Sequence, residues 1–375
     1  MPLRVPRRGM DDRAVPARRS APIAMKPTRA AVLAIVSALL FGASTPLAKL
    51  LLRDMDPWLL AGILYLGSGA GLLLVDGARR LSGHAYRREA SLRGVQWMWL
   101  ALAILFGGVL APGLLMYGLA GTSASAAALL LNLEAIFTAL LAWFVFGENF
   151  DRRIALGMGV IALGAVVLSW PGGTAAGGAT AFMAIAAACL AWAIDNNVTR
   201  KIALTDPVQV AWPKGCVAGI VNVGIALASG SALPSADGAL FAGLVGFLGY
   251  GVSLALFVRA LRDLGAARTG AYFSLAPFFG AVLAVVLFRQ ELSAQLVIAA
   301  LLMGLGVWLH LTERHDHEHD HLPLDHEHAH VHDEHHQHAH DGSELAGEPH
   351  SHRHRHAPLR HRHVHYPDTH HHHQH

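Results

Sequence analysis

Three charged residues, Glu134, Asp195 and Lys214, stand in stretches of sequence that are otherwise apolar. Glu134 lies halfway along "LLLNLEAIFTALLAWFVFGE" (129–148), which is long enough to cross a bilayer. A charged side chain at mid-membrane costs roughly 2.5–3.5 kcal/mol on insertion scales, so it is seldom retained without a partner or a function. Because a carboxyl in this setting can load a proton on one side and release it on the other, we expect Glu134 to couple protons. The alternative is a neutral glutamic acid with a structural hydrogen bond.

Polar neighbours accompany both acids. Thr138 lies one helical turn from Glu134 and shares its face of a helix. Asp195 and Asn196 form a second pair, shortly before a basic pair at 200–201, so they are either the wall of a binding site or an interfacial cap.

Lys214 has two interpretations. It either snorkels to the membrane interface or forms an ion pair with Asp195 or Glu134. In the second case its ammonium is available to a substrate carboxylate whenever the pair opens. Further candidates for the lining of a cavity, each of which could equally be a packing residue, are Ser44, Thr45, Tyr117, Trp192, Asn222, Tyr272 and Ser274.

The end of the chain carries a different chemistry, because most of its 26 histidines follow residue 314 in runs such as "HDHEHDH". Alternating His-x-His with interspersed Asp and Glu predicts binding of Zn²⁺, Ni²⁺, Co²⁺ or Cu²⁺. This segment lacks the apolar residues needed to fold alone. The candidate metal ligands are His315, His317, His319, His321, His326, His328, His330, His332, His335, His336, His338 and His340.

The elements that position the charged residues are membrane helices. The chain is 53% hydrophobic and 15% charged even with its polar tail included, which excludes a soluble globular class. Apolar runs of the length needed to cross a bilayer predict ten spans. They lie at 31–52, 57–75, 96–119, 123–146, 153–170, 179–198, 208–228, 238–258, 269–288 and 292–311.

The distribution of Lys and Arg predicts the orientation, since cytoplasmic loops accumulate positive charge. The loops that contain Arg79, Arg152, Arg200 and Arg262 fall on the same side as the basic segment 1–29, so we expect both termini in the cytoplasm. Both cysteines lie inside predicted spans, which excludes a disulfide framework. No phosphate-binding loop, Ser/His/Asp arrangement or nucleic-acid patch is present, so neither an enzyme nor a nucleic-acid-binding protein is expected.

The spans repeat. "EAIFTALLAWFVFGE" (134–148) aligns without a gap with "PFFGAVLAVVLFRQE" (277–291), and "LLFGASTPLAKLLL" resembles "LAWAIDNNVTRKIA". These matches divide the chain into repeats at 30–170 and 178–311, followed by a tail at 312–375. Since five spans is an odd number, the second repeat is inverted relative to the first, a design that favours alternating access. The matched acids Glu148 and Glu291 are expected to be architectural.

The first-span "FGAS" and the junction "FGENFDRRIALGMGVIALGAVVL", echoed as "FRQELSAQLVIAALLMGLGVWL", resemble the EamA family of the drug/metabolite transporter superfamily. The resemblance covers about residues 30–311. It implies a bacterial inner-membrane carrier, often an exporter of amino acids or other small metabolites, commonly driven by protons and without a required cofactor. The family usually has proline at the position of Glu134, as this chain does at Pro277.

We therefore predict an all-α integral membrane protein with ten helices in two inverted five-helix repeats and disordered termini. The predicted function is secondary transport of a small metabolite, with the lipid bilayer, the substrate and protons as partners. Two alternatives are a divalent-metal exporter whose tail collects its cargo, and a membrane-anchored metal buffer or sensor. The oligomeric state is open, with a homodimer as one alternative.

Overall fold

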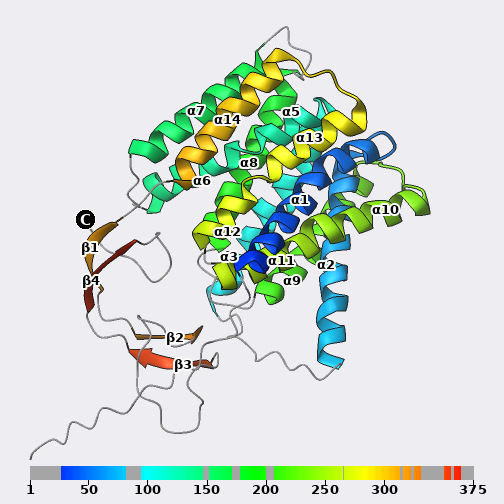
Figure 1. Cartoon of the computed structure of the whole chain (residues 1–375). Helices are drawn as coiled ribbons and strands as arrows, with labels where there is room; N and C mark the ends of the chain where they lie inside the picture. The colour runs from blue at the N-terminus through cyan, green and yellow to red at the C-terminus, as the bar shows by residue number, and fades with distance from the viewer. Residues whose placement is uncertain are drawn as a thin grey trace, which may run out of the picture.

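The computed structural model describes residues 27–81, 94–146, 152–170, 178–199, 207–264 and 266–312, and residues 316–321, 325–330, 350–355 and 359–364 of the tail. These residues form a helical bundle followed by short strands (Figure 1). The first repeat contains α1 (Pro27–Leu51), α2 (Pro57–Leu81), α3 (Gln96–Ala103), η1 (Ile104–Leu110), α4 (Ala111–Ala120), α5 (Ala124–Leu130), α6 (Leu133–Phe146) and α7 (Arg152–Ser169). The second contains α8 (Ala179–Thr199), α9 (Pro207–Ala228), α10 (Ala236–Gly246), η3 (Phe247–Val252), α11 (Ser253–Leu264), α12 (Ala266–Phe273), α13 (Ala276–Phe288) and α14 (Ala294–Leu311).

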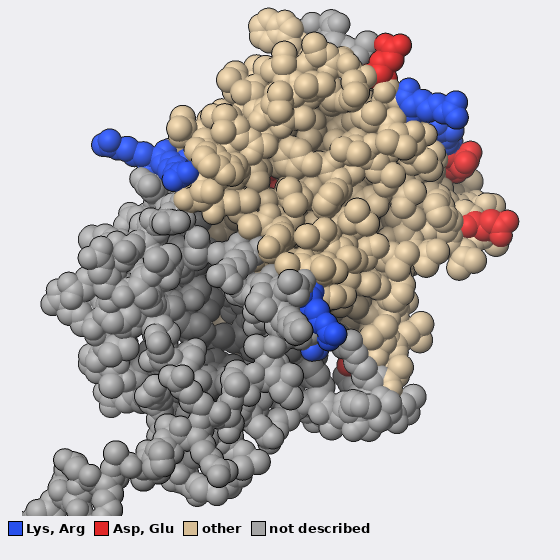
Figure 2. All heavy atoms as spheres, in the orientation of Figure 1, with Lys and Arg blue, Asp and Glu red and all other residues tan. Residues whose placement is uncertain are grey.

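The predicted membrane class is confirmed. Within the described ranges, nine helical segments are long and apolar enough to cross a membrane, and α14 supplies a shorter apolar run, Ala294–Leu309. Large apolar side chains point outward, among them Leu240, 75% exposed, and Leu301, 69% exposed. Figure 2 shows a broad face almost free of charge, with Lys, Arg, Asp and Glu at its edges. Such a surface suits lipid rather than water.

The helix packing follows the two repeats. The second spans of the repeats, α2 and α9, pack against each other, and so do the fifth spans, α7 and α14, which run side by side in Figure 1. The first span α1 packs on η3, α11 and α13 of the other repeat, as α8 packs on η1, α4 and α6. Each of these contacts therefore has a counterpart in the other half, as expected for two inverted five-helix repeats.

The third span of each repeat contains a π-helical segment at its middle, η1 in the first and η3 in the second. Both segments are rich in glycine, with Gly107 and Gly108 in η1 and Gly249 in η3. A Cβ added at Gly107 would collide with the side chain of Asp195, and one added at Gly249 would collide with that of Ser44. Glycine is therefore needed in both segments because a side chain of the opposite repeat's first span lies directly against the backbone.

The fourth and ninth spans are broken, whereas the sequence predicted continuous spans at 123–146 and 269–288. The first ends α5 at Leu130 and begins α6 at Leu133; the second ends α12 at Phe273 and begins α13 at Ala276. At the first break Asn132 Nδ2 donates to the Leu129 carbonyl at 2.8 Å, and at the second Ser274 Oγ donates to the Ala271 carbonyl at 2.8 Å. These side chains compete with the helix for backbone partners, which explains why the α-helical pattern is interrupted at these two places.

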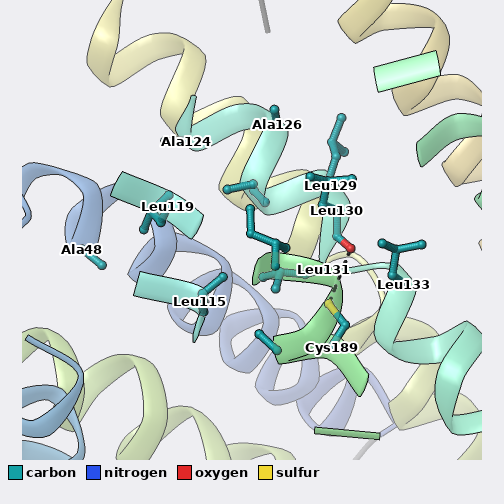
Figure 3. Packing of buried hydrophobic residues seen from close by; sticks show 14 of the residues in the cluster. Ala48, Leu115, Leu119, Ala124, Ala126, Leu129, Leu130, Leu131, Leu133 and Cys189 are labelled. Atoms are coloured by element: carbon teal, nitrogen blue, oxygen red, sulfur yellow. Dashed lines mark hydrogen bonds between the residues drawn. The ribbon is translucent and has the colours of Figure 1, made fainter. Parts of the chain in front are cut away.

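The break in the fourth span is enclosed by the main hydrophobic core. Figure 3 shows Leu129, Leu130, Leu131 and Leu133 packed beside α8, with Cys189 pointing at the Leu130 carbonyl. The Cys189 thiol donates to that carbonyl at an Sγ···O distance of 3.7 Å. A backbone acceptor released by the break is thereby satisfied inside the apolar interior.

Hydrogen bonds join helices at one end of the bundle, one set within the first repeat and one bond between the two repeats. Lys49 Nζ at the end of α1 donates to the carbonyls of Leu119 (2.6 Å) and Ala120 (3.0 Å) at the end of α4. Ser125 Oγ in α5 donates to Gln290 Oε1, which follows α13, at 2.5 Å. By the predicted orientation this is the end opposite the basic loops.

The described part of the tail forms four short strands in two antiparallel pairs. Strand β1 (Asp316–His321) pairs with β4 (Leu359–Val364), and β2 (Asp325–His330) pairs with β3 (His350–Arg355). The composition of this segment predicted disorder. It did not indicate the backbone pairing that the structure has at these positions.

Candidate functional site

Glu134 lies in the first turn of α6, just after the break in the fourth span. The N-terminus of a helix favours a negative charge, so the break supplies partial compensation near the middle of the apolar span Ala124–Val145. Asn196 Nδ2 of α8 donates to Glu134 Oε1 at 2.7 Å and reaches Thr138 Oγ1 at 3.5 Å. One carboxamide thus contacts both residues, which confirms that Glu134 and Thr138 share a face.

Asp195 and Lys214 form a direct ion pair between α8 and α9. Asp195 is buried, at 5% exposure, and also accepts a hydrogen bond from Thr199 Oγ1 at 3.0 Å. Its carboxylate faces Gly107 in the middle of the third span. The ion pair that the sequence offered as one interpretation of Lys214 is present. Of the two acids considered as partners for Lys214, the structure selects Asp195.

Three side chains from three helices converge on the carbonyls of η1. Tyr65 of α2 donates its hydroxyl to Gly107 O at 2.7 Å, and Trp192 Nε1 of α8 donates to the same oxygen at 3.1 Å. Asn222 Nδ2 of α9 donates to Gly108 O at 2.9 Å. The carbonyls of the π-helical segment are thus satisfied from outside the span, which fixes η1 against Asp195.

Aromatic rings connect this region to the other repeat. Tyr65 and Tyr250 lie with ring centroids 5.6 Å apart, and Tyr250 lies 5.8 Å from Phe41 of α1. Phe41 aligns with Trp192 in the repeat. The first span of each repeat therefore contributes an aromatic residue to this region. We refer to Glu134, Asp195, Asn196, Lys214, Tyr65 and Trp192 together as the central polar cluster.

The remaining predicted site residues are distributed as follows. Ser44 is buried and donates to the Phe41 carbonyl at 2.6 Å, and Thr45 is buried beside it. Tyr272 and Ser274 stand at the break in the ninth span. Tyr117 is 55% exposed, and no hydrogen bond within the described ranges joins it to the central polar cluster.

Sequence reasoning missed Tyr65, Gly107, Gly108 and Tyr250. The signal that could have found the glycines is the consecutive pair in "LFGGVL" (105–110). Tyr65 and Tyr250 are polar aromatic residues near the middle of their spans rather than at the interfaces where such residues gather.

The predicted metal ligands are only partly described. His317, His319 and His321 belong to β1, and His326, His328 and His330 belong to β2. His315, His332, His335, His336, His338 and His340 lie outside the described residues. Among the residues that the structure describes, no group of three or more His, Cys, Asp or Glu side chains could hold a metal ion.

Comparisons with known proteins agree with this architecture. The chain is 29% identical over 293 residues to an uncharacterized transporter of Methanothermobacter thermautotrophicus, covering 73% of this chain and 84% of that protein. It also shares its fold with a solved crystal structure at a TM-score of 0.55 and 20% identity, over 76% of this chain and 96% of the other. The model of the EamA-like transporter family matches residues 28–170 and 179–312, one match for each repeat. The chain therefore belongs to the EamA-like transporter family and is a multi-pass membrane transporter, not an enzyme.

Proposed function

We propose that this transporter moves a small organic metabolite, such as an amino acid, in exchange for protons. The observation that carries the proposal is the hydrogen bond between Glu134 and Asn196 at the break of the fourth span. It places an ionisable carboxyl at the contact of two helices from different repeats, where a midplane site of an inverted-repeat carrier is formed. No cofactor is needed for this exchange.

The neighbouring ion pair supports a role for substrate in the same place. Lys214 and Asp195 form an ion pair, and Glu134 lies within electrostatic range of both. A carboxylate of the substrate can replace Asp195 as the partner of Lys214. The carboxylate of Asp195 is then unpaired and is stabilised by binding a cation or a proton. Binding and proton loading are thereby linked through charge alone.

The proposal includes a direction of transport and a cellular location. The basic loops support a cytoplasmic location for both termini, and a bacterial inner membrane is the location that the family resemblance implies. With a proton gradient directed inward, a proton-exchange carrier exports its substrate. Fusion of a reporter to either terminus tests the orientation.

Transport by purified protein in liposomes tests the proposal. An outside-acid pH gradient should drive efflux of amino acids from the liposomes. The Glu134→Gln substitution should abolish the dependence of this efflux on the gradient. Glu291→Gln is the matched control, because Glu291 is an exposed acid near the end of the ninth span. A Glu134→Gln protein whose gradient-driven flux equals that of the parent contradicts the proposed proton role.

A second activity, metal binding by the tail, is supported by the strand register. His317 lies opposite His363 and His319 opposite His361, while His326, His328 and His330 lie opposite His354, His352 and His350. Residues at directly opposed positions of an antiparallel pair are neighbours across the two strands, and histidine is the commonest metal-ligating residue type. Proteoliposomes with and without residues 313–375 distinguish a bound metal from a transported one.

A further inference from the structure

We propose that the metal ions taken up by the tail bind between two strands, on a face of each strand pair where histidine is the sole potential ligand. This inference rests on the metal binding proposed above and deepens it, because it names the ligands, the ions and the pairing that brings the ligands together. Transport through the helices does not depend on it.

The tail contains two segments of opposite charge. Residues 316–330 include five acids and no Lys or Arg, whereas residues 350–364 include four arginines and no Asp or Glu. Each strand pair takes one strand from each segment, since β1 pairs with β4 and β2 pairs with β3. The attraction between the two segments therefore favours the pairing that the structure has.

The register matches these charges position by position. Four of the five acids lie directly opposite an arginine, and facing residues of opposite charge stabilise two antiparallel strands. In each strand pair, a shift of the register by one residue would remove every one of these matches. The facing residues are Glu318 and Arg362, Asp320 and Arg360, Asp325 and Arg355, and Glu327 and Arg353.

The histidines occupy the alternate positions and therefore the other face of each strand pair, because successive residues of a strand belong to opposite faces. Facing residues of antiparallel strands have Cβ atoms about 4.5–5.5 Å apart, and the next facing pair on the same face lies about 7 Å along the strand. Two neighbouring pairs, such as His317 with His363 and His319 with His361, therefore offer four imidazoles to one ion. Strands β2 and β3 contain three such pairs in succession.

This arrangement separates the imidazoles from the carboxylates, and the separation determines which ions bind. The acids lie on the opposite face and are matched by arginines, so nitrogen is the ligand atom available to an ion between the strands. Imidazole suits Zn²⁺, Ni²⁺ and Cu²⁺, whereas Mg²⁺ and Ca²⁺ prefer oxygen ligands. No three potential ligands are gathered within the described ranges, and we expect the ion itself to draw the imidazoles of two neighbouring pairs together.

Nitroxide labels on a pair of facing cysteines test the inference in the full-length purified protein. Ala329 and Ser351 lie opposite each other in β2 and β3, on the face without histidines, so Ala329→Cys and Ser351→Cys leave every proposed ligand in place. Cys216 is replaced by Ala, and native Cys189 is fully buried. With saturating Zn²⁺ the two labels should lie close enough to broaden the spectrum by dipolar coupling, and an excess of Mg²⁺ should not displace the Zn²⁺.

Charge reversal and its compensation test the register. Arg353→Glu with Arg355→Glu sets acids opposite Glu327 and Asp325, and should raise the Zn²⁺ concentration at half-maximal broadening several-fold. Added negative charge alone would instead favour the binding of a cation. Adding Asp325→Arg and Glu327→Arg restores facing residues of opposite charge, with the charges exchanged between the strands, and should return the Zn²⁺ response to that of the parent.

Zn²⁺ binding that is unchanged or stronger in the reversed chain, or that does not recover in the compensated chain, overturns the inference. Calorimetry of the same proteins separates this result from failure of metal binding itself. Heat from Zn²⁺ without broadening leaves metal binding by the tail standing and refutes the site between the strands, whereas the absence of any heat refutes both.

Discussion

Glu134 and Pro277 occupy the same place in the two repeats: each lies in the first turn of the second helix of a broken span. Both residue types suit that position for different reasons. Proline has no N–H to leave unpaired in the first turn, and glutamate is stabilised by the helix N-terminus. The alignment of an acid with a proline, which looks unlike a repeat, reflects one backbone requirement met in two ways.

This equivalence predicts that Glu134→Pro folds but does not couple protons. The change removes the hydrogen bond from Glu134 N to Leu131 O, at 3.1 Å, which costs about 1 kcal/mol. We expect normal expression, a melting temperature in detergent close to that of the parent, and no response of transport to a pH gradient. Loss of the folded protein would show that the two first turns are not equivalent.

Much of the fold could be predicted from the sequence because length and hydropathy determine membrane spans directly. The internal repeat added the pairing of the halves. The breaks in the fourth and ninth spans could not be predicted in this way, because Asn132 and Ser274 are single polar residues in apolar runs and end a helix only through contacts with their own backbone.

The site shows the same division. Glu134, Asp195 and Lys214 were found because charge in a membrane is costly wherever it occurs. The role of Gly107 depends on Asp195 lying against it from the other repeat, and that proximity is a property of the packing. Distant contacts of this kind leave no local trace in the sequence.

The ion pair between Asp195 and Lys214 predicts non-additive stability. Asp195→Asn or Lys214→Met alone leaves an unpaired charge beside η1, which costs about 3–5 kcal/mol. The double variant removes both charges and should be more stable than either single variant, while transport remains lost in all three. Thermal unfolding of the purified proteins measures the coupling, and additive effects of the two substitutions would contradict a direct pair.

Gly107→Ala should disrupt the central polar cluster through Asp195. The new methyl group would overlap the Asp195 carboxylate, so it must push that side chain away from Lys214. We expect at least about a tenfold loss of transport, the change that corresponds to about 1.4 kcal/mol. Gly159→Ala is the matched control, because an added Cβ there meets nothing within 4 Å. Indistinguishable behaviour of the two variants would place Asp195 away from Gly107.

The hydrogen bond between Ser125 and Gln290 predicts a reversible block of transport. The two side chains join the fourth span to the end of the ninth span, and alternating access requires that end to separate during each cycle. Cysteines at positions 125 and 290, in a chain whose Cys216 is replaced by Ala, should cross-link on oxidation and stop flux until a reductant is added. Native Cys189 does not interfere because it is fully buried. Full flux through the cross-linked protein contradicts the predicted opening.

Removal of the tail after Thr312 should separate metal binding from transport. Arg153 donates to Thr312 Oγ1 at 2.7 Å and lies over the Trp308 ring at 5.4 Å, so a chain ending at Thr312 keeps the contacts that hold the end of α14 to α7. We expect its melting temperature and amino-acid flux to equal those of the full chain. Calorimetric titration with Ni²⁺ or Zn²⁺ should lose nearly all its heat, since the opposed histidines of β1 to β4 are gone. Flux that falls with the tail and returns on adding metal to the full chain would instead make the tail part of the transport cycle.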